Sequence, residues 1–263
     1  MIVAGIDVGG KNLHIIIKKD GRILGKTAGA TGIKKAEAVE RFYDEALKKA
    51  GLTRRDVERV VATGSSAKRV TFANGFIPDA VADACGANRL LPSARTVIDV
   101  GAEEGRAIKI SPEGNVLDFA IHGKCAAGTG MFLQAMAKVM QVNLEQMAEY
   151  SLKAKNKADI SGTCAVFAES EVISHIHRVP PTPKEEIIAG IHASMVSRVM
   201  GLLKRLGITR EVALVGGVAR NKGLVDILEK ELGFKVRVPE NPELVAALGA
   251  AILAKENLEK ENK

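Results

Sequence analysis

Hydrophobic and polar residues follow a pattern along the chain that changes from strand-like to helix-like twice. The apolar stretch IVAGIDVGG (2–10) predicts a buried strand, and residues 12–30 predict a hairpin with its turn at 19–22. Apolar residues at helical spacing then predict an amphipathic helix over 34–51, which ends at Gly51. Residues 94–121 repeat the opening order of strand, aspartate, glycine and hairpin.

The remaining segments alternate between strands and helices and include a proline-rich break at 178–183. The pattern predicts strands at 57–64, 211–219 and 235–239, and helices at 76–91, 128–141, 143–153, 164–178, 184–206, 221–232 and 242–260. This order is typical of an α/β protein. No low-complexity linker separates the halves, so we expect two tightly joined lobes, 1–118 and 119–263.

Composition narrows the class of protein. Of the 263 residues 46% are hydrophobic but only 3% are aromatic, which predicts an aliphatic core of the kind found in α/β proteins. No apolar run suggests a membrane span, and Met1 leads straight into a strand rather than a signal peptide, so we expect a cytoplasmic protein. The net charge of +7 is spread along the chain, and with so few aromatics we expect no nucleic acid partner.

Three glycine-bearing turns follow predicted strands and carry the candidate chemistry. They are GIDVGGKN (5–12), VIDVGAEEG (97–105) and LVGGVARN (214–221). Glycine lets backbone N–H groups approach a ligand closely, which suits phosphate oxygens. Asp7 and Asp99 end their strands, where a carboxylate can hold Mg²⁺ or orient an attacking water. Each turn alone is most simply an ordinary β-turn, and no GxxxxGK[ST] phosphate loop occurs.

Together, the three turns resemble those of the two-lobed actin–sugar kinase–Hsp70 ATPase fold. The resemblance implies that the two aspartate hairpins face the phosphates of ATP or ADP, and that the late Gly-Gly turn faces the adenosine. The residues it assigns to the nucleotide are Gly9, Gly10, Lys11, Asn12, Gly101, Ala102, Gly128, Gly216, Gly217, Asn221 and Glu243.

Two of the three cysteines lie at predicted helix starts. Cys125 stands in KCAAGTG and Cys164 in SGTCAV, where the helix dipole favours a thiolate. A [4Fe–4S] cluster takes four thiolates, which two chains related by a two-fold axis would supply. The alternative is that each is a small buried residue, as we expect for Cys85.

Four stretches give a more specific resemblance. KCAAGTGMFL, ISGTCAVFAESEVIS, IAGIHASMVSRVMGL and GGVARN…ALGAA resemble the ATPase activators of 2-hydroxyacyl-CoA dehydratases, a family that includes the ATPase subunits of benzoyl-CoA reductase. The resemblance runs from Gly5 to about Ala254.

That family resemblance implies a homodimer with one bridging [4Fe–4S] cluster held by Cys125 and Cys164. Ferredoxin or flavodoxin would reduce the cluster, and ATP hydrolysis would change the angle between the cluster helices. The electron would then pass at low potential to an iron–sulfur dehydratase or reductase.

The chain departs from the family pattern in its phosphate turns, before the Cys125 motif and near the last helix. Glu103 replaces a glutamine, His14 a lysine and Glu243 a glutamine, and His122 with its neighbour replaces Asn-Asp. Glu103 could act with Asp7 and Asp99 as a catalytic base, or could repel ATP. Two other functions stay open: a small-molecule kinase of the same fold, and an iron–sulfur redox scaffold that does not hydrolyse ATP.

Overall fold

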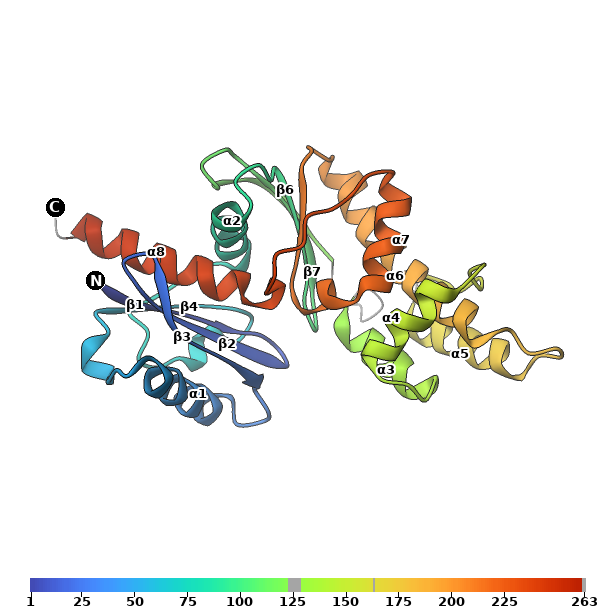
Figure 1. Cartoon of the computed structure of the whole chain (residues 1–263), viewed down its shortest axis with the longest axis horizontal. Coiled ribbons are helices and arrows are strands. Elements are labelled where there is room, and N and C mark those ends of the chain that lie inside the picture. Colours follow the sequence, from blue (N-terminus) through green and yellow to red (C-terminus); the bar gives the residue numbers. More distant parts are fainter. Residues whose placement is uncertain (123–128, 163, 262–263) are drawn as a thin grey trace.

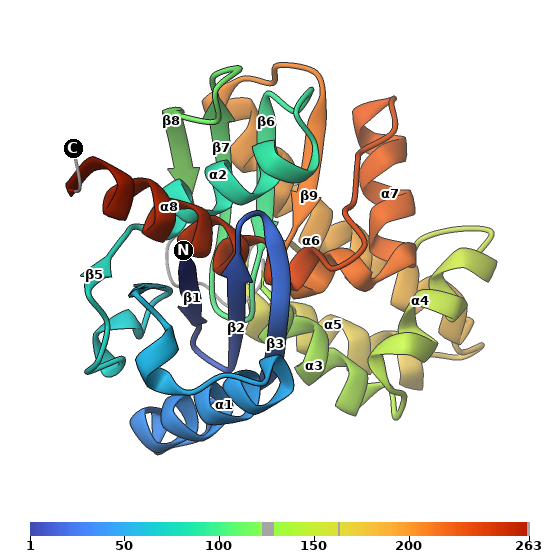
Figure 2. The ribbon, with the colours of Figure 1, turned by 60° about the vertical axis from the view of Figure 1, so that its left-hand side comes forward.

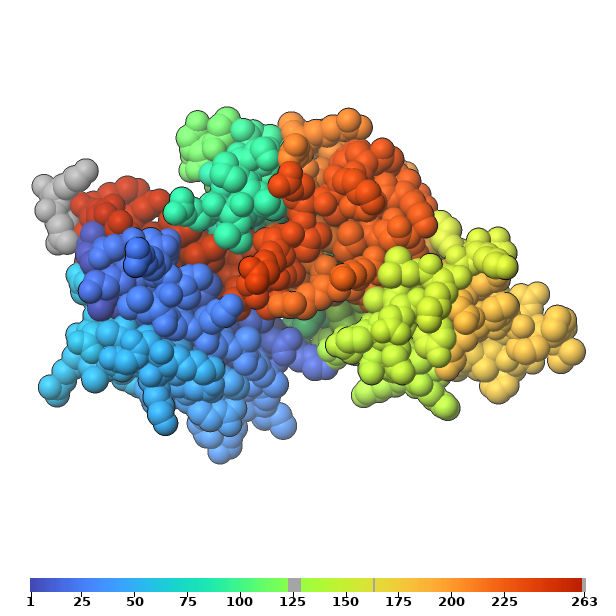
Figure 3. All heavy atoms as spheres, viewed as in Figure 1, coloured from blue at the N-terminus to red at the C-terminus, as the bar shows by residue number. Residues whose placement is uncertain are grey.

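The computed structural model describes residues 1–122, 129–162 and 164–261. Two β-sheets and their covering helices form the body of the molecule, and a group of helices extends from the end far from both termini (Figure 1). The space-filling view shows a hollow between this helical extension and the part of the chain around the first helix (Figure 3).

The first sheet has the strand order β3-β2-β1-β4-β5. Strands β1, β2 and β3 form an antiparallel meander, and β4 runs parallel to β1. The strands are β1 Ile2–Val8, β2 Asn12–Lys19, β3 Arg22–Ala30, β4 Arg59–Thr63 and β5 Gly75–Phe76. Asp20 and Gly21 both adopt positive φ, which is the conformation a two-residue hairpin turn requires and confirms the turn predicted at 19–22.

Both faces of this sheet are covered, which explains the near-continuous apolar run of β1. Ala4, Ile6 and Val8 pack with helix α1 (Lys35–Ala50), whereas Val3 packs with helix α8 (Val245–Glu261) on the other face. At Gly5 a Cβ atom would lie 2.1 Å from a carbonyl oxygen of α8, so glycine permits the close packing of helix on sheet.

The second sheet repeats this plan. Its order is β8-β7-β6-β9, with an antiparallel meander followed by a parallel strand. The strands are β6 Thr96–Val100, β7 Gly105–Ile110, β8 Val116–Ile121 and β9 Val212–Val215. Helix α2 (Asp79–Leu90) covers one face and α6 (Lys184–Leu206) the other. The repeat predicted for residues 94–121 is therefore confirmed.

Helices α2 and α8 join the two halves. They lie against each other between the two sheets (Figure 2). Glycines make the contact close, because a Cβ on Gly249 would lie 1.9 Å from the Ala82 carbonyl oxygen and one on Gly86 would lie 2.1 Å from that of Val245. The two sheets therefore meet through a tight helix pair rather than a linker.

The helical extension consists of α3 (Gly130–Val139), α4 (Leu144–Lys153) and α5 (Ala165–His177), and α7 (Lys222–Leu232) follows β9. All four correspond to predicted helices. They share the largest apolar core with α6. Helix α6 is long and apolar enough to cross a membrane by length and composition, but 67% of that window is buried, as in a core helix.

The structure differs from the sequence-based prediction after β9, and β8 crosses the predicted division between the lobes. The strand expected at 235–239 is wrong, because only Arg237 pairs, in an isolated bridge with Ala213. Strand β9 is only four residues long, and Pro239 has no N–H to donate, so the pairing with β9 does not extend beyond this bridge. The division at residue 118 stays a prediction; β8 crosses that position, and the second sheet takes strands from both sides of it.

Candidate active site

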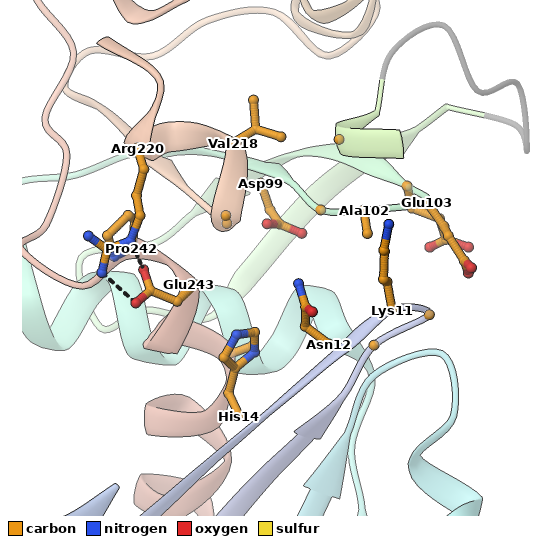
Figure 4. A pocket seen from close by; sticks show the side chains of 18 of the residues that line it. Lys11, Asn12, His14, Asp99, Ala102, Glu103, Val218, Arg220, Pro242 and Glu243 are labelled. Atoms are coloured by element: carbon orange, nitrogen blue, oxygen red, sulfur yellow. Dashed lines mark hydrogen bonds and ion pairs between the residues drawn. The ribbon is translucent and has the colours of Figure 1, made fainter. Parts of the chain in front are cut away.

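A cavity of about 630 Å³ lies where the three glycine turns come together. The turns follow β1, β6 and β9, so the strand ends of both sheets face the same space (Figure 4). Gly128 lies outside the described residues. Every other residue that the sequence assigned to the nucleotide or to catalysis lines this cavity, namely Asp7, Gly9, Gly10, Lys11, Asn12, Asp99, Gly101, Ala102, Glu103, Gly216, Gly217, Asn221 and Glu243.

Each of the two aspartates predicted to be catalytic lies against a glycine that follows the neighbouring parallel strand. Gly64 follows β4 with φ 98°, and a Cβ there would lie 2.6 Å from Asp7 Oδ1. Gly216 follows β9 with φ 84°, and a Cβ there would lie 2.3 Å from Asp99 Oδ1. The turn VATGSS at Gly64 is thus a fourth glycine turn, which also brings Ser65 into the lining and which the sequence analysis missed.

Arg106 on β7 compensates a group of buried carboxylates that the sequence analysis also missed. Arg106 is only 8% exposed. It forms ion pairs at 3.1 Å with Asp83, 3.3 Å with Glu104, 3.5 Å with Asp99 and 3.7 Å with Asp79. A charge this deep is stable only when it is paired, so Arg106 and the carboxylates form one electrostatic unit.

Burial changes the acidity of this unit. It raises the pKa of Asp99 to about 6, although the charge of Arg106 opposes the increase and that of Asp7 adds to it. Burial also raises the pKa of Asp83 and of Asp79, with neighbouring carboxylates adding to both increases. The raised pKa of Asp99 lies close to neutral pH, which suits a carboxylate that accepts a proton in a reaction.

Two side chains flank the first turn. His14 Nδ1 lies 3.3 Å from Asp7 Oδ2, so the imidazole holds this carboxylate in place. Glu103 reaches across from the second turn to the first, because a Cβ on Gly10 would lie 1.9 Å from the Glu103 Cδ atom. The Glu103 carboxylate thus fills the space that Gly10 leaves open. This position is compatible with both roles expected of Glu103, a catalytic base and a group that repels ATP.

The opposite end of the cavity carries a bidentate ion pair. Arg220 donates from Nη2 to Glu243 Oε1 at 2.5 Å and from Nε to Glu243 Oε2 at 2.9 Å (Figure 4). Burial alone raises the pKa of Glu243, but the Arg220 hydrogen bonds outweigh it and the pKa lies below its ordinary value. The pair joins the short helix Gly217–Arg220 to the turn Pro242–Leu244 and is fully charged at neutral pH.

Asn221 is fixed in the same region by two contacts. Its Oδ1 accepts the Leu224 N–H at the start of α7, at 3.1 Å. Its Nδ2 lies 3.1 Å from Nε2 of His192, which is fully buried on α6. Burial lowers the pKa of His192 to about 3, so the imidazole is neutral and Nε2 accepts the Asn221 N–H. This arrangement positions Asn221 without adding charge.

The cysteine site is described for one of its two predicted ligands. Cys164 precedes α5, where hydrogen bonds from the backbone of Phe167 and Val166 lower the pKa of the thiol. An accessible thiol stabilised as thiolate fits a cluster ligand. Cys125 lies outside the described residues, and among those described no three His, Cys, Asp or Glu side chains gather to hold a metal ion. Burial raises the pKa of Cys85 to about 12, which keeps this thiol protonated.

Comparison with known proteins places the chain in a family. Residues 4–254 match the BadF/BadG/BcrA/BcrD ATPase family. The chain belongs to this family. It is 38% identical over 260 residues to the 2-hydroxyisocaproyl-CoA dehydratase activator of Clostridioides difficile, covering 97% of this chain and 95% of the other. It is also 38% identical over 252 residues, 95% of each chain, to the (R)-2-hydroxyglutaryl-CoA dehydratase activating ATPase of Acidaminococcus fermentans.

Solved structures confirm the fold expected from the three turns. The 2-hydroxyisocaproyl-CoA dehydratase activator of Clostridium difficile with bound ADPNP superposes with a TM-score of 0.92 at 37% identity, covering 100% of this chain and 97% of the other. A ROK family glucokinase from Streptomyces griseus superposes with a TM-score of 0.62 at 14% identity, which shows the fold alone. This family member is an ATPase with the actin–sugar kinase–Hsp70 fold.

Proposed function

We propose that the protein is an ATP-dependent activator that delivers a low-potential electron to an iron–sulfur enzyme such as a 2-hydroxyacyl-CoA dehydratase. The observation that carries this proposal is a pair of hydrogen bonds between a predicted phosphate turn and the start of α3, the helix that follows Cys125 in the sequence. The N–H groups of Gly130 and Met131, at the start of α3, donate to the carbonyl oxygens of Gly101 and Ala102 at 2.9 Å each. Because α3 begins five residues after Cys125 in the sequence, a change at this phosphate turn would be passed toward the predicted cluster ligand.

The cavity provides the parts of a nucleotide site. Backbone N–H groups at the tips of the first two turns, at Gly10 and Ala102, would receive the phosphates, because those of Gly9 and Gly101 close the turns on the carbonyl oxygens of Asn12 and Glu104 at 2.9 Å each. The turn at 216–217, with Asn221 and Glu243, would receive the adenosine. The volume of the cavity, about 630 Å³, is within the range of about 300–1,000 Å³ typical of small-molecule sites. The ADPNP-bound activator with the same fold supports this assignment.

Hydrolysis requires a water, a base and compensation of the phosphate charge. Asp7 would hold Mg²⁺ through its waters, and the ion would neutralise charge that develops on the phosphates. Asp99 lies in the cavity with a pKa of about 6, so its carboxylate can take the proton of the attacking water. His14 keeps Asp7 in position at 3.3 Å.

The electron-transfer half requires a second copy of the chain. Cys125 and Cys164 supply two thiolates, and a homodimer supplies the four that a bridging [4Fe–4S] cluster needs. Such a cluster accepts one electron and passes it on. The side chains of Val166 and Phe167 beside Cys164 are 67% and 63% exposed, which supports an apolar surface that is covered in the dimer. Ferredoxin or flavodoxin would be the electron donor in the cytoplasm.

Iron analysis of the protein purified without oxygen tests the cluster. We expect about four irons and four sulfides per dimer, and a brown colour that is lost in Cys125→Ser and in Cys164→Ser. Cys85→Ser is the matched control and should keep the full iron content, because the half-buried Cys85 thiol stays protonated. A colourless wild-type protein after reconstitution would contradict the electron-transfer function and favour a kinase of the same fold.

A further inference from the structure

Among the described residues that line the cavity, one cation has no carboxylate partner. Most of the ionisable side chains of the cavity are acidic: Asp7, Asp79, Asp83, Asp99, Glu103, Glu104, Glu145 and Glu243. Arg106 and Arg220 are paired with members of this set. Among the described lining residues, Lys11 is the remaining ammonium or guanidinium group, and its Nζ donates to the neutral amide oxygen Oε1 of Gln134.

A triphosphate that enters such an acidic cavity needs a cation close to its terminal phosphate. The bond between Lys11 and Gln134 has an ionised donor but a neutral acceptor. A phosphate oxygen is a charged acceptor, and bonds between two ionised groups are shorter and stronger. Lys11 Nζ therefore gains by leaving Gln134 for the γ-phosphate, which a diphosphate lacks, while the β-phosphate of either nucleotide would bind the backbone N–H groups of the turns.

Gln134 belongs to α3, the helix already tied to the second phosphate turn. The start of α3 is bonded to the carbonyl oxygens at 101–102, and Gln134 lies one turn further along. Helix α3 is thus held by the second turn at its first residues and by Lys11 of the first turn at Gln134. Gly130, where the helix begins, is the fifth residue after Cys125.

We propose that Lys11 distinguishes ATP from ADP and releases α3 when ATP binds. With ADP or no nucleotide, Lys11 Nζ holds Gln134 and ties α3 to the β1–β2 turn. With ATP, the same ammonium binds the terminal phosphate and Gln134 is freed. This inference rests on the proposed nucleotide site. It makes Lys11 and Gln134 the two side chains that pass the nucleotide state to α3, the helix that follows Cys125 in the sequence.

Calorimetric titration with Mg²⁺–ADPNP and Mg²⁺–ADP tests the first half. We expect Lys11→Met to weaken ADPNP binding about tenfold or more and to leave ADP within about twofold, since a charged hydrogen bond is lost only with the triphosphate. Gln134→Ala removes the competing acceptor and should tighten ADPNP by about two- to threefold. Gln134→Glu should weaken it, because the carboxylate pairs with Lys11. Lys26→Met, an exposed lysine on β3, controls for net charge and should change neither affinity.

Hydrogen exchange of the α3 amides tests the second half. In the wild type, ADPNP should raise exchange over 134–139 relative to ADP. Gln134→Ala should show the same exchange with both nucleotides, while Lys138→Ala, at an exposed position of α3, should keep the difference. An unchanged ratio of ADPNP to ADP affinity in Lys11→Met would overturn the inference while leaving the nucleotide site standing. Failure of the wild type to bind either nucleotide would overturn both.

Discussion

The carboxylate of Asp99 lies against the bare backbone of Gly216, at a point where a Cβ atom would be 2.3 Å from Asp99 Oδ1. Asp7 and Gly64 repeat this relationship in the other sheet, at 2.6 Å. In both cases the glycine has a positive φ, which an L side chain rarely adopts. The two halves of the cavity are therefore built on one unit: an aspartate at the last but one position of a strand, beside a glycine that directly follows the parallel neighbour.

This unit predicts that Gly216→Ala is damaging. The substitution introduces strain at φ 84° and a clash with Asp99, so we expect a loss of about 1–3 kcal/mol in the free energy of unfolding. Gly217→Ala is the matched control for stability, because nothing lies within 4 Å of its Cβ position. Urea denaturation compares the two. Equal stability of both variants would mean that the glycine unit is not required for packing.

Removal of Arg106 should destabilise the protein in a pH-dependent way. Arg106→Met leaves Asp83 and Asp99 buried without a partner, which typically costs about 3–5 kcal/mol at neutral pH. The folded pKa of each carboxyl lies above its unfolded value, so its contribution to stability is present at low pH and is lost as pH rises through the folded pKa.

The variant should therefore lose least near pH 5 and most above pH 6, as measured by thermal unfolding at several pH values. The double variant Asp83→Asn with Arg106→Met should recover part of the loss. A pH-independent effect of Arg106→Met would show that Arg106 acts through packing instead.

The rate of ATP hydrolysis should follow the ionisation of Asp99. Because burial raises its pKa to about 6, the carboxylate that accepts a proton disappears as pH falls through that value. We expect kcat to fall about tenfold for each pH unit below 6, and Asp99→Asn to lose most of the activity at all pH values. A flat profile between pH 5 and 8 with Asp99 intact would remove it as the base.

Glu103 adds a carboxylate that rests between the two phosphate turns, against Gly10. In a cavity already rich in acidic groups, we expect Glu103→Gln to tighten ATP binding by several-fold and to leave kcat nearly unchanged. Binding and turnover are measured on the same preparations. A strong fall in kcat would instead make Glu103 the base, and indifference in both would place its side chain outside the reaction.

Local patterns predicted most of the fold, while the missing site residues depend on contacts between distant segments. Asp7 and Asp99 could be recognised because each ends an apolar strand before a glycine. Arg106 could not, since its role depends on β7 meeting Asp83 of α2, and nothing in the local sequence of either element indicates that contact.

The same reasoning applies to the end of the cavity near Glu243. Arg220 gains its role from a partner 23 positions further along the chain. The expected strand at 235–239 failed for a related reason, because its apolar pattern suits a strand but β9 offers pairing only to Arg237. Gly64 did carry a readable signal, a glycine directly after the strand-like VVAT, and was overlooked.

The central claim, that ATP drives an electron from a shared cluster, is tested most directly by the rate at which the reduced protein gives up its electron. Protein reduced by ferredoxin is mixed with a low-potential viologen acceptor, and the cluster signal is followed by electron paramagnetic resonance with Mg²⁺–ATP or Mg²⁺–ADP. We predict at least tenfold faster oxidation with ATP in the wild type and in Cys85→Ser, and no cluster signal in Cys125→Ser or Cys164→Ser. Equal rates with ATP and ADP in a protein that holds its cluster would contradict the account.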